Sequence, residues 1–190
     1  MSRGHVERGL DAVAQALQAS KVLSPKVAEL AKRYAGVLRG GGTLFFCGNG
    51  GSAADAQHLA AEYVVRYTGN RKAYSALALT TDTSVLTAAG NDLGFEQVFA
   101  RQVEALCSPR DLLILHSTSG ASSNLLAAAR RARELGIPIA AFLGKGGGAL
   151  AALVDDPLVV PSDQTSLVQI VHLALEHLIV ELVELELAGG

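Results

Sequence analysis

Five short apolar segments alternate with helical patterns along most of this chain, and that alternation limits the folds it can adopt. The candidate strands are residues 43–47, 75–79, 111–115, 138–142 and 157–160. Helical patterns lie between them near 53–66, 83–89, 95–106, 122–135 and 149–153, and a long helix is expected from about 164 to 187. Strands that alternate with helices form parallel sheets, because a parallel pair needs a crossover connection. The chain is therefore predicted to be an α/β protein whose parallel sheet is covered by helices on both faces.

Two further helices are expected before the first strand, over residues 6–19 and 25–38. Ser24 before Pro25 is typical of a helix start, where a serine caps free N–H groups and a proline fits the first turn. The glycines at 40–42 are a typical helix stop. No linker, repeat or low-complexity tract follows, so residues 1–190 are predicted to form one domain with a helical N-terminal extension over residues 1–40.

The composition is typical of an intracellular protein that does not bind polyanions. A formal net charge of -2 gives no electrostatic attraction to nucleic acid or to an anionic membrane. Cys47 and Cys107 are too few to define a disulfide framework, which fits a reducing compartment. The first residues lack the hydrophobic segment of a secretory signal. We therefore expect a cytoplasmic protein without a nucleic-acid partner.

The expected last helix is apolar around most of its circumference. Its apolar residues include Leu167, Val168, Ile170, Val171, Leu173, Leu175, Leu178, Ile179, Val180 and Leu182. A membrane span is not expected, because the same stretch holds His172, Glu176 and His177 and further glutamates. A helix that is apolar on nearly all sides is buried from several sides. In so short a chain the simplest cover is another subunit, so an oligomer is predicted.

A glycine-rich turn follows the first expected strand. Residues 47–52 read Cys-Gly-Asn-Gly-Gly-Ser, and a helix is expected directly after them. Unpaired N–H groups at a helix start, at the positive end of the helix dipole, suit a phosphate. This turn, from Asn49 through Gly50 and Gly51 to Ser52, is therefore a candidate phosphate site.

The third expected strand is also followed by a polar turn. Residues 117–122 read Ser-Thr-Ser-Gly-Ala-Ser and precede a helix. Hydroxyl and backbone N–H groups in such a turn bind phosphate oxygens without a cation. Either turn alone could simply cap its helix. Two such turns at the ends of two strands of one predicted sheet favour phosphate binding.

Two other glycine motifs are possible, and both match poorly. The run from Gly48 to Ala53 resembles a dinucleotide fingerprint, but the acidic residue expected about 20 residues further on is missing, since Asp82 comes too late. The run from Gly144 to Gly148 contains Lys145, yet no Ser or Thr follows that lysine as a Walker motif requires. We interpret residues 144–148 as a mobile loop.

The helix after the glycine-rich turn carries a candidate metal or acid/base pair. His58 and Glu62 are four residues apart, so they share one helix face. A phosphate turn beside such a pair has the outline of an active site.

The last helix offers partners for that pair, with one ambiguity. Gln169 and His177 are eight residues apart, so their directions differ by roughly 80° and they can converge on one site. His172 and Glu176 form a rival pair on a different face. Spacing alone does not choose between His172 and His177.

These motifs together resemble the sugar isomerase (SIS) domain, and specifically the sedoheptulose 7-phosphate isomerases, also called phosphoheptose isomerases. Further matching motifs are Asp55 three residues before His58, the Arg66-Tyr67 pair and residues 90–95, which read Gly-Asn-Asp-Leu-Gly-Phe. The resemblance covers nearly the whole chain. It implies a three-layer αβα sandwich with a five-stranded parallel sheet, similar to flavodoxin.

The resemblance also implies roles for individual residues. In the family, residues that match Ser52, Ser117, Ser119 and Ser122 hold the sugar phosphate. Those that match His58, Glu62, Gln169 and His177 bind zinc, one ion per subunit, and Glu62 and His177 are the acid/base candidates. The family thus favours His177 over His172. The other implied substrate contacts are Asn49, Gly50, Gly51, Arg66, Asn91, Asp92, Thr118 and Gln169.

The family further implies a homotetramer with active sites between subunits, to which residues 1–40 would contribute. The implied reaction converts the phosphosugar sedoheptulose 7-phosphate to D-glycero-D-manno-heptose 7-phosphate, an early step toward nucleotide-activated heptose. This chain has Ser166, Leu167 and Ile170 where the family commonly has an acidic residue, an arginine and a glutamate. Ala121 stands where an asparagine is common. These differences leave the exact phosphosugar open.

Two alternatives to this activity remain at the level of the sequence. One is a non-catalytic SIS-type tetramer that regulates or binds another protein, as a replication-initiator-associating member of this fold does. The other is an isomerase of another phosphosugar. Glu62 and His177 are not Glu and His in that replication-associated relative, and both are retained here. The isomerase is therefore the favoured reading.

Overall fold

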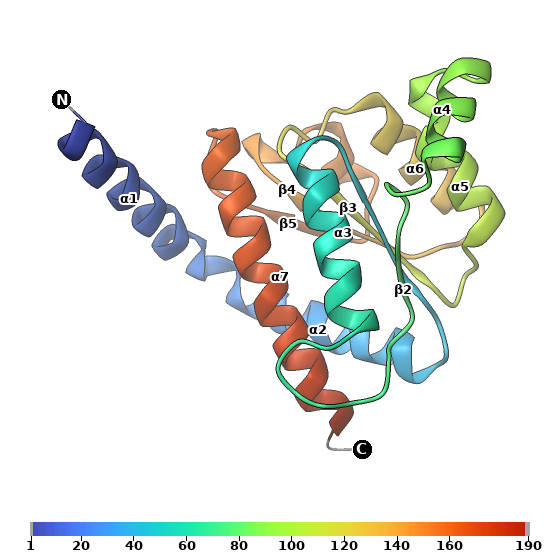
Figure 1. Ribbon diagram of the computed structural model, residues 1–190, viewed down its shortest axis with the longest axis horizontal. Coiled ribbons are helices and arrows are strands. Elements are labelled where there is room, and N and C mark those ends of the chain that lie inside the picture. The colour runs from blue at the N-terminus through green and yellow to red at the C-terminus, as the bar shows by residue number, and fades with distance from the viewer. Residues whose placement is uncertain (1, 189–190) are drawn as a thin grey trace.

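The computed structural model describes residues 2–188 and has a parallel sheet between two layers of helices (Figure 1). Within these residues the strand order is β2-β1-β3-β4-β5, and every neighbouring pair is parallel. The strands are β1 (Leu44–Gly48), β2 (Ala76–Ala78), β3 (Leu112–Ser117), β4 (Ile139–Leu143) and β5 (Asp156–Val159). The predicted α/β fold with a five-stranded parallel sheet is confirmed, with strand ends shifted by one or two residues.

The helices lie on both faces of this sheet. They are α1 (Ser2–Ala19), α2 (Ser24–Arg39), α3 (Gly51–Val64), α4 (Thr83–Asp92), α5 (Val98–Leu106), α6 (Ser123–Glu134) and α7 (Thr165–Ala188). Short 3₁₀ turns are η1 (Ser20–Leu23), η2 (Phe95–Gln97) and η3 (Lys145–Ala152). The helix expected over 95–106 is therefore divided into η2 and α5.

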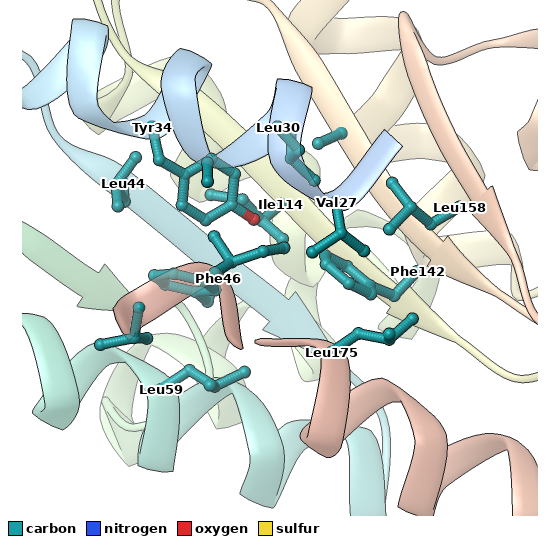
Figure 2. Close-up of a cluster of buried hydrophobic side chains, with 14 of the residues drawn as sticks. Val27, Leu30, Tyr34, Leu44, Phe46, Leu59, Ile114, Phe142, Leu158 and Leu175 are labelled. Carbon is teal, nitrogen blue, oxygen red and sulfur yellow. The ribbon is translucent and has the colours of Figure 1, made fainter. Parts of the chain in front are cut away.

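Alternate residues of the strands build two separate cores. Phe46 and Ile114 point to the side of α2, α3 and α7, where Tyr34, Leu59 and Leu175 meet them (Figure 2). The intervening residues of the same strands, such as Phe45 and Leu115, pack against α5 and α6. Because successive side chains of a strand point to opposite faces, strands covered on both sides must be apolar throughout. Burying each such large side chain contributes about 1.5–3 kcal/mol to the free energy of folding.

The start of α2 differs from the prediction. The residue at its N-cap position is Leu23, with helical angles of φ -84 and ψ -7. Ser24 is also helical, and its hydroxyl donates a 2.7 Å hydrogen bond to the carbonyl of Lys21. The prediction of Ser24 as a cap was wrong because η1 carries the backbone into α2 without a non-helical residue. The first turn of α2 therefore continues directly from the 3₁₀ turn, and no side chain of the described residues caps its N–H groups.

The glycine segment predicted to be a mobile loop is instead a packed turn, η3. Gly147 is buried, and a Cβ placed on Gly120 would lie 1.9 Å from its carbonyl oxygen. Gly120 has φ +62 and its carbonyl accepts a 3.0 Å hydrogen bond from Leu150 N. The left-handed angles at residues 146–148 let the backbone fold onto the turn after β3. That close backbone packing is what the sequence pattern did not reveal.

Helix α7 combines a buried and an exposed apolar face. By length and composition alone it could cross a membrane. In the structure it packs on α2 and α3, and its buried residues include His172, Glu176 and Glu184. Ile170, Leu178, Leu182 and Leu185 stay exposed on it, as do Val6, Leu10 and Leu17 on α1. Helix α1 extends away from the rest of the molecule (Figure 1).

Candidate functional site

The carboxyl ends of β1 and β3 lie side by side in the sheet. Their register pairs Gly48 with His116, so the two polar turns begin next to each other. Asn49 of the first turn and Asn124 at the start of α6 exchange amide hydrogen bonds of 2.9 and 2.8 Å. The two candidate phosphate turns therefore form one continuous edge, as the sequence predicted from their place after two strands.

Three helix starts meet at this edge. Helices α3 and α6 begin directly after the two turns. A Cβ on Gly51 would lie 2.5 Å from Gln169 Nε2, so the side chain of Gln169, in the second turn of α7, touches the first turn of α3. Gly50 reaches this arrangement with φ +56, and Ser52 is buried beneath it. Each helix start contributes N–H groups and a positive dipole end, the features that bind anions.

The hydroxyl groups of the second turn shape its backbone. Ser117 Oγ accepts a 3.0 Å hydrogen bond from Gly120 N, and Ser119 Oγ accepts one of 3.3 Å from Ala121 N. Both hydroxyls keep their own hydrogen to donate. Ser122 stands at the N-cap of α6, and Thr118 is half-buried between these residues. The four predicted residues thus occupy one turn that has donors available for an anion.

A cluster of three side chains that could hold a metal ion lies between α3 and α7. His58 Nε2 is 2.9 Å from His177 Nε2 and 3.4 Å from Glu62 Oε1. One ligand atom from each residue lies within 4.8 Å of the others. Burial, with a contribution from His58, lowers the pKa of His177, which favours its neutral imidazole. A neutral imidazole is the form that binds metal or accepts a proton.

The spacing and chemistry of this cluster fit a zinc ion. Two ligands of a tetrahedral zinc, each about 2.0–2.2 Å from the metal, lie roughly 3.3–3.5 Å apart. The His58–Glu62 distance of 3.4 Å falls in that range, and the 2.9 Å between the imidazoles needs only a small opening. Imidazole and carboxylate are typical zinc ligands. Gln169 lies two turns before His177 on α7, against Gly51.

The rival histidine of α7 lies elsewhere. His172 is fully buried, and its Nε2 lies 3.2 Å from the carbonyl oxygen of Leu143. Burial lowers its pKa to about 3. Glu176 points into the core, where its Oε1 lies 3.0 Å from His116 Nε2. The geometry thus brings His177, and not His172, to His58 and Glu62.

Three of the predicted substrate contacts, Arg66, Asn91 and Asp92, make no side-chain hydrogen bond or ion pair with the turns or the cluster among the described residues. Arg66 is exposed beyond the end of α3. Asn91 and Asp92 are exposed at the end of α4, where their side chains are joined by a 2.7 Å hydrogen bond. Helix α4 lies at the opposite side of the molecule from α7 (Figure 1). The cluster itself is open to solvent, since the His58 side chain is 46% exposed.

The sequence analysis gave no role to several neighbours of the site, although it named Tyr67 within a matching motif. The ring of Tyr67 stacks on His177, with centroids 5.5 Å apart and planes at 18°. Glu184 bonds the loop that carries Tyr67. Glu184 follows His177 by seven residues, two helical turns, and that spacing could have indicated a shared face. Asn124 gave no such signal, because its pairing with Asn49 depends on the strand register.

The chain is similar to known proteins along most of its length. The family model described as "SIS domain" matches residues 10–144 of this chain. A phosphoheptose isomerase from Akkermansia muciniphila is 47% identical over 178 residues, which cover 94% of each chain. Phosphoheptose isomerase 1 from Campylobacter jejuni is 49% identical over 168 residues, 88% of this chain and 90% of that one.

Solved structures agree with these sequence matches. The structure of a phosphoheptose isomerase from Neisseria gonorrhoeae superposes with a TM-score of 0.91 at 38% identity, covering 97% of this chain and 99% of the other. The phosphate-type turns lie at the carboxyl ends of β1 and β3, and the His58, Glu62 and His177 cluster lies further along the helix that begins at the first turn, between α3 and α7. The chain therefore belongs to the SIS-domain family and, within it, to the phosphoheptose isomerases, a family of isomerase enzymes.

Proposed function

We propose that this protein converts sedoheptulose 7-phosphate to D-glycero-D-manno-heptose 7-phosphate through an enediol, early in the formation of nucleotide-activated heptose. The observation that carries the proposal is the combination of two adjacent phosphate-type turns with the His58, Glu62 and His177 cluster, which lies further along the helix that begins at the first turn. Relatives at 47–49% identity bear the name phosphoheptose isomerase. An isomerase of a phosphorylated sugar needs a phosphate anchor and proton-transfer groups, and the two turns and the cluster offer these.

The phosphate is proposed to bind the two turns. Ser52, Ser117, Ser119 and Ser122 donate hydroxyl hydrogen bonds, and the backbone of residues 49–51 and Thr118 adds N–H groups. Binding energy from this remote group holds the reacting carbons in place. Arg66, Asn91 and Asp92, which the cluster of one chain does not contact, are proposed to approach the substrate in a neighbouring subunit's site.

Glu62 and His177 are proposed to move the protons. The reaction transfers one proton between C1 and C2 and a second between the two oxygens, so it needs a base and a proton shuttle. Glu62 lies close to His58 and is partly buried, with 19% of its side chain exposed. A carboxylate bound firmly to a metal is a weak base, so either Glu62 loosens from the metal or His177 takes the base role.

His58, Glu62, Gln169 and His177 are proposed to hold one zinc ion per subunit. Bound there, zinc supplies Lewis-acid polarisation of the substrate carbonyl and hydroxyl. Two imidazoles, one amide and one carboxylate leave the site with net positive charge, which suits a developing enediolate.

The enzyme is proposed to be a cytoplasmic homotetramer. The exposed apolar side chains of α1 and α7 support this assembly, because contiguous apolar faces of helices mark protein interfaces. Helix α7 carries both Gln169 and His177, so a subunit covering its open face would also enclose the cluster.

Turnover of sedoheptulose 7-phosphate by the metal-stripped protein, before and after addition of zinc, tests the proposal. We expect zinc-dependent formation of the aldoheptose phosphate. Glu62→Gln and His177→Gln should each lower kcat by about 100-fold or more, the usual contribution of a general acid or base, with the oligomer intact. Near-wild-type turnover by either variant would refute its assigned role. No turnover by a zinc-loaded tetramer would favour another phosphosugar or a regulatory tetramer, with Ser166, Leu167 and Ile170 as the residues to examine.

A further inference from the structure

The loop that follows α3 is held by a single carboxylate of α7. Glu184 accepts hydrogen bonds from the backbone N–H groups of Tyr67 (3.0 Å), Thr68 (3.2 Å) and Gly69 (3.1 Å). It also accepts one of 2.9 Å from the Thr68 hydroxyl and one of 2.7 Å from Arg71 Nε. Charge-assisted bonds of this kind are about twice as strong as neutral ones. Glu184 therefore fixes the backbone of residues 67–69 relative to α7.

Arg71 connects the same carboxylate to the end of α3. Its Nη2 donates a 2.7 Å hydrogen bond to the carbonyl of Glu62, and its Nη1 donates one of 2.8 Å to the carbonyl of Tyr63. The guanidinium also lies 4.1 Å from the ring centroid of Tyr74. A cation bonded to the last carbonyls of a helix stabilises that end, where the dipole is negative. The side chains of Arg71 and Glu184 are only 11% and 10% exposed, so little solvent screens the pair.

The Arg71–Glu184 ion pair thus connects α3, α7 and the loop between them, which surround the cluster of His58, Glu62 and His177. Its arginine, Arg71, bonds the main chain of Glu62 on α3. Its carboxylate, Glu184, lies on α7, two turns after His177. Between them lies Tyr67, whose backbone N–H bonds Glu184 and whose ring stacks on the imidazole of His177. The arrangement fixes both the separation of the two helices and the plane of one ligand.

We propose that Arg71 and Glu184 form a positioning clamp for the metal site, with Tyr67 as the contact that sets the ring plane of His177. The proposal rests on the proposed function only in taking the cluster to be a zinc site. Metal sites depend on such neighbours, and loss of a residue that orients a ligand commonly lowers metal affinity 10–100-fold. Arg71 and Glu184 act through His177 and Glu62 and are not themselves in the cluster.

Zinc affinity of the full-length protein, measured by competition with a chromophoric chelator, tests the clamp. Arg71→Lys and Glu184→Gln should each weaken zinc binding about 10-fold or more, because neither replacement can serve all the partners of the original side chain. Tyr67→Leu should weaken it as well, and Tyr67→Phe, which keeps the stacked ring, should restore wild-type affinity.

The Arg33–Asp156 ion pair provides a matched control. It joins α2 to β5, shares no contact with the loop of residues 67–71 or with the cluster in the described part of the chain, and has side chains that are 34% and 35% exposed. Arg33→Lys and Asp156→Asn should change zinc affinity by less than about 2-fold, since they touch no part of the site. The thermal midpoint of every variant is measured alongside. Clamp variants that stay folded and bind zinc like the controls would overturn the proposal.

A readout without metal separates this proposal from the function. In the zinc-free protein, the ring protons of His177 should carry an upfield NMR shift from Tyr67, retained in Tyr67→Phe and reduced in Tyr67→Leu, Arg71→Lys and Glu184→Gln. An unchanged shift in the two clamp variants would refute the positioning role. A wild-type protein that binds zinc but does not isomerise the heptose would refute only the proposed function. One that binds no zinc would refute the clamp as a metal-site device.

Discussion

Glu176 and Glu184 lie eight residues apart on α7, and their surroundings shift their pKa values in opposite directions. Burial by itself would raise the pKa of Glu184, but the N–H groups of Tyr67 and Gly69, together with Arg71 and Thr68, lower it to about 2. Burial raises the pKa of Glu176 well above its usual value. Glu176 is fully buried beside His116, and its Oε2 has no hydrogen-bond partner among the described residues.

The difference shows that donors, and not depth alone, decide whether a buried carboxyl is charged. Glu184 exchanges its hydration for backbone and arginine donors, so its ionised form is stable where it lies. Among the described residues, Glu176 has only the His116 imidazole and the Tyr34 hydroxyl beside it, and burial lowers the pKa of that His116 to about 4. A neutral imidazole and a carboxyl of raised pKa form an uncharged pair. Helix α7 therefore carries the charged Glu184–Arg71 ion pair near its end and the uncharged Glu176–His116 pair in the core.

The largest expected effect comes from removing the acceptor at residue 184. Glu184→Leu leaves the guanidinium of Arg71 and the N–H groups of residues 67–69 without their partner, so unfolding in urea should show a loss of about 3–5 kcal/mol. Glu176→Leu leaves two neutral groups, the His116 imidazole and the Tyr34 hydroxyl, without the carboxyl and should lose about 1–3 kcal/mol. Equal losses in the two variants would contradict the comparison.

The pH dependence should separate the two glutamates next. Because the folded pKa of Glu184, about 2, lies below the usual 4.5, its contribution is fully present above about pH 4.5 and is lost as the pH falls toward 2. A shift of this size corresponds to roughly 3 kcal/mol. The stability difference between wild type and Glu184→Gln, measured by urea unfolding, should therefore be constant above pH 5 and shrink below it. A difference that persists unchanged at pH 3 would show that Glu184 is not ionised in the fold.

The smallest effect is expected when the neutral pair is replaced as a whole. His116→Leu combined with Glu176→Leu should be neutral or stabilising by about 1–2 kcal/mol, since well-packed apolar residues often replace a buried polar pair without loss. Thermal and urea unfolding of the double variant check this. A loss above that of either single variant would show that the pair contributes more to the core than its one contact suggests. The expected gain has no counterpart at Arg71 and Glu184, where backbone donors would remain.

The fold was largely predictable from the sequence, because each strand is an apolar run bounded by glycines and polar residues. The pairing of His58 with Glu62 followed from helix periodicity. The choice of His177 over His172 did not, since spacing leaves both open and only the packing of α7 on α3 decides it. The clamp was beyond prediction for the same reason: Arg71 lies in an irregular loop, where no period relates a side chain to its partners. Ser24 shows the reverse error, a local capping signal overridden by the continuous backbone of η1.

The meeting of three helix starts at one edge of the sheet has a consequence for the conditions under which the enzyme works. Backbone N–H groups and serine hydroxyls do not titrate near neutral pH, unlike the histidines that hold anions in some other proteins. A phosphate bound by α3, α6 and the turns before them would lose affinity with falling pH only through its own second ionisation, near pH 6. A change in KM between pH 5 and 7 would then report on the substrate phosphate and not on the groups that hold it.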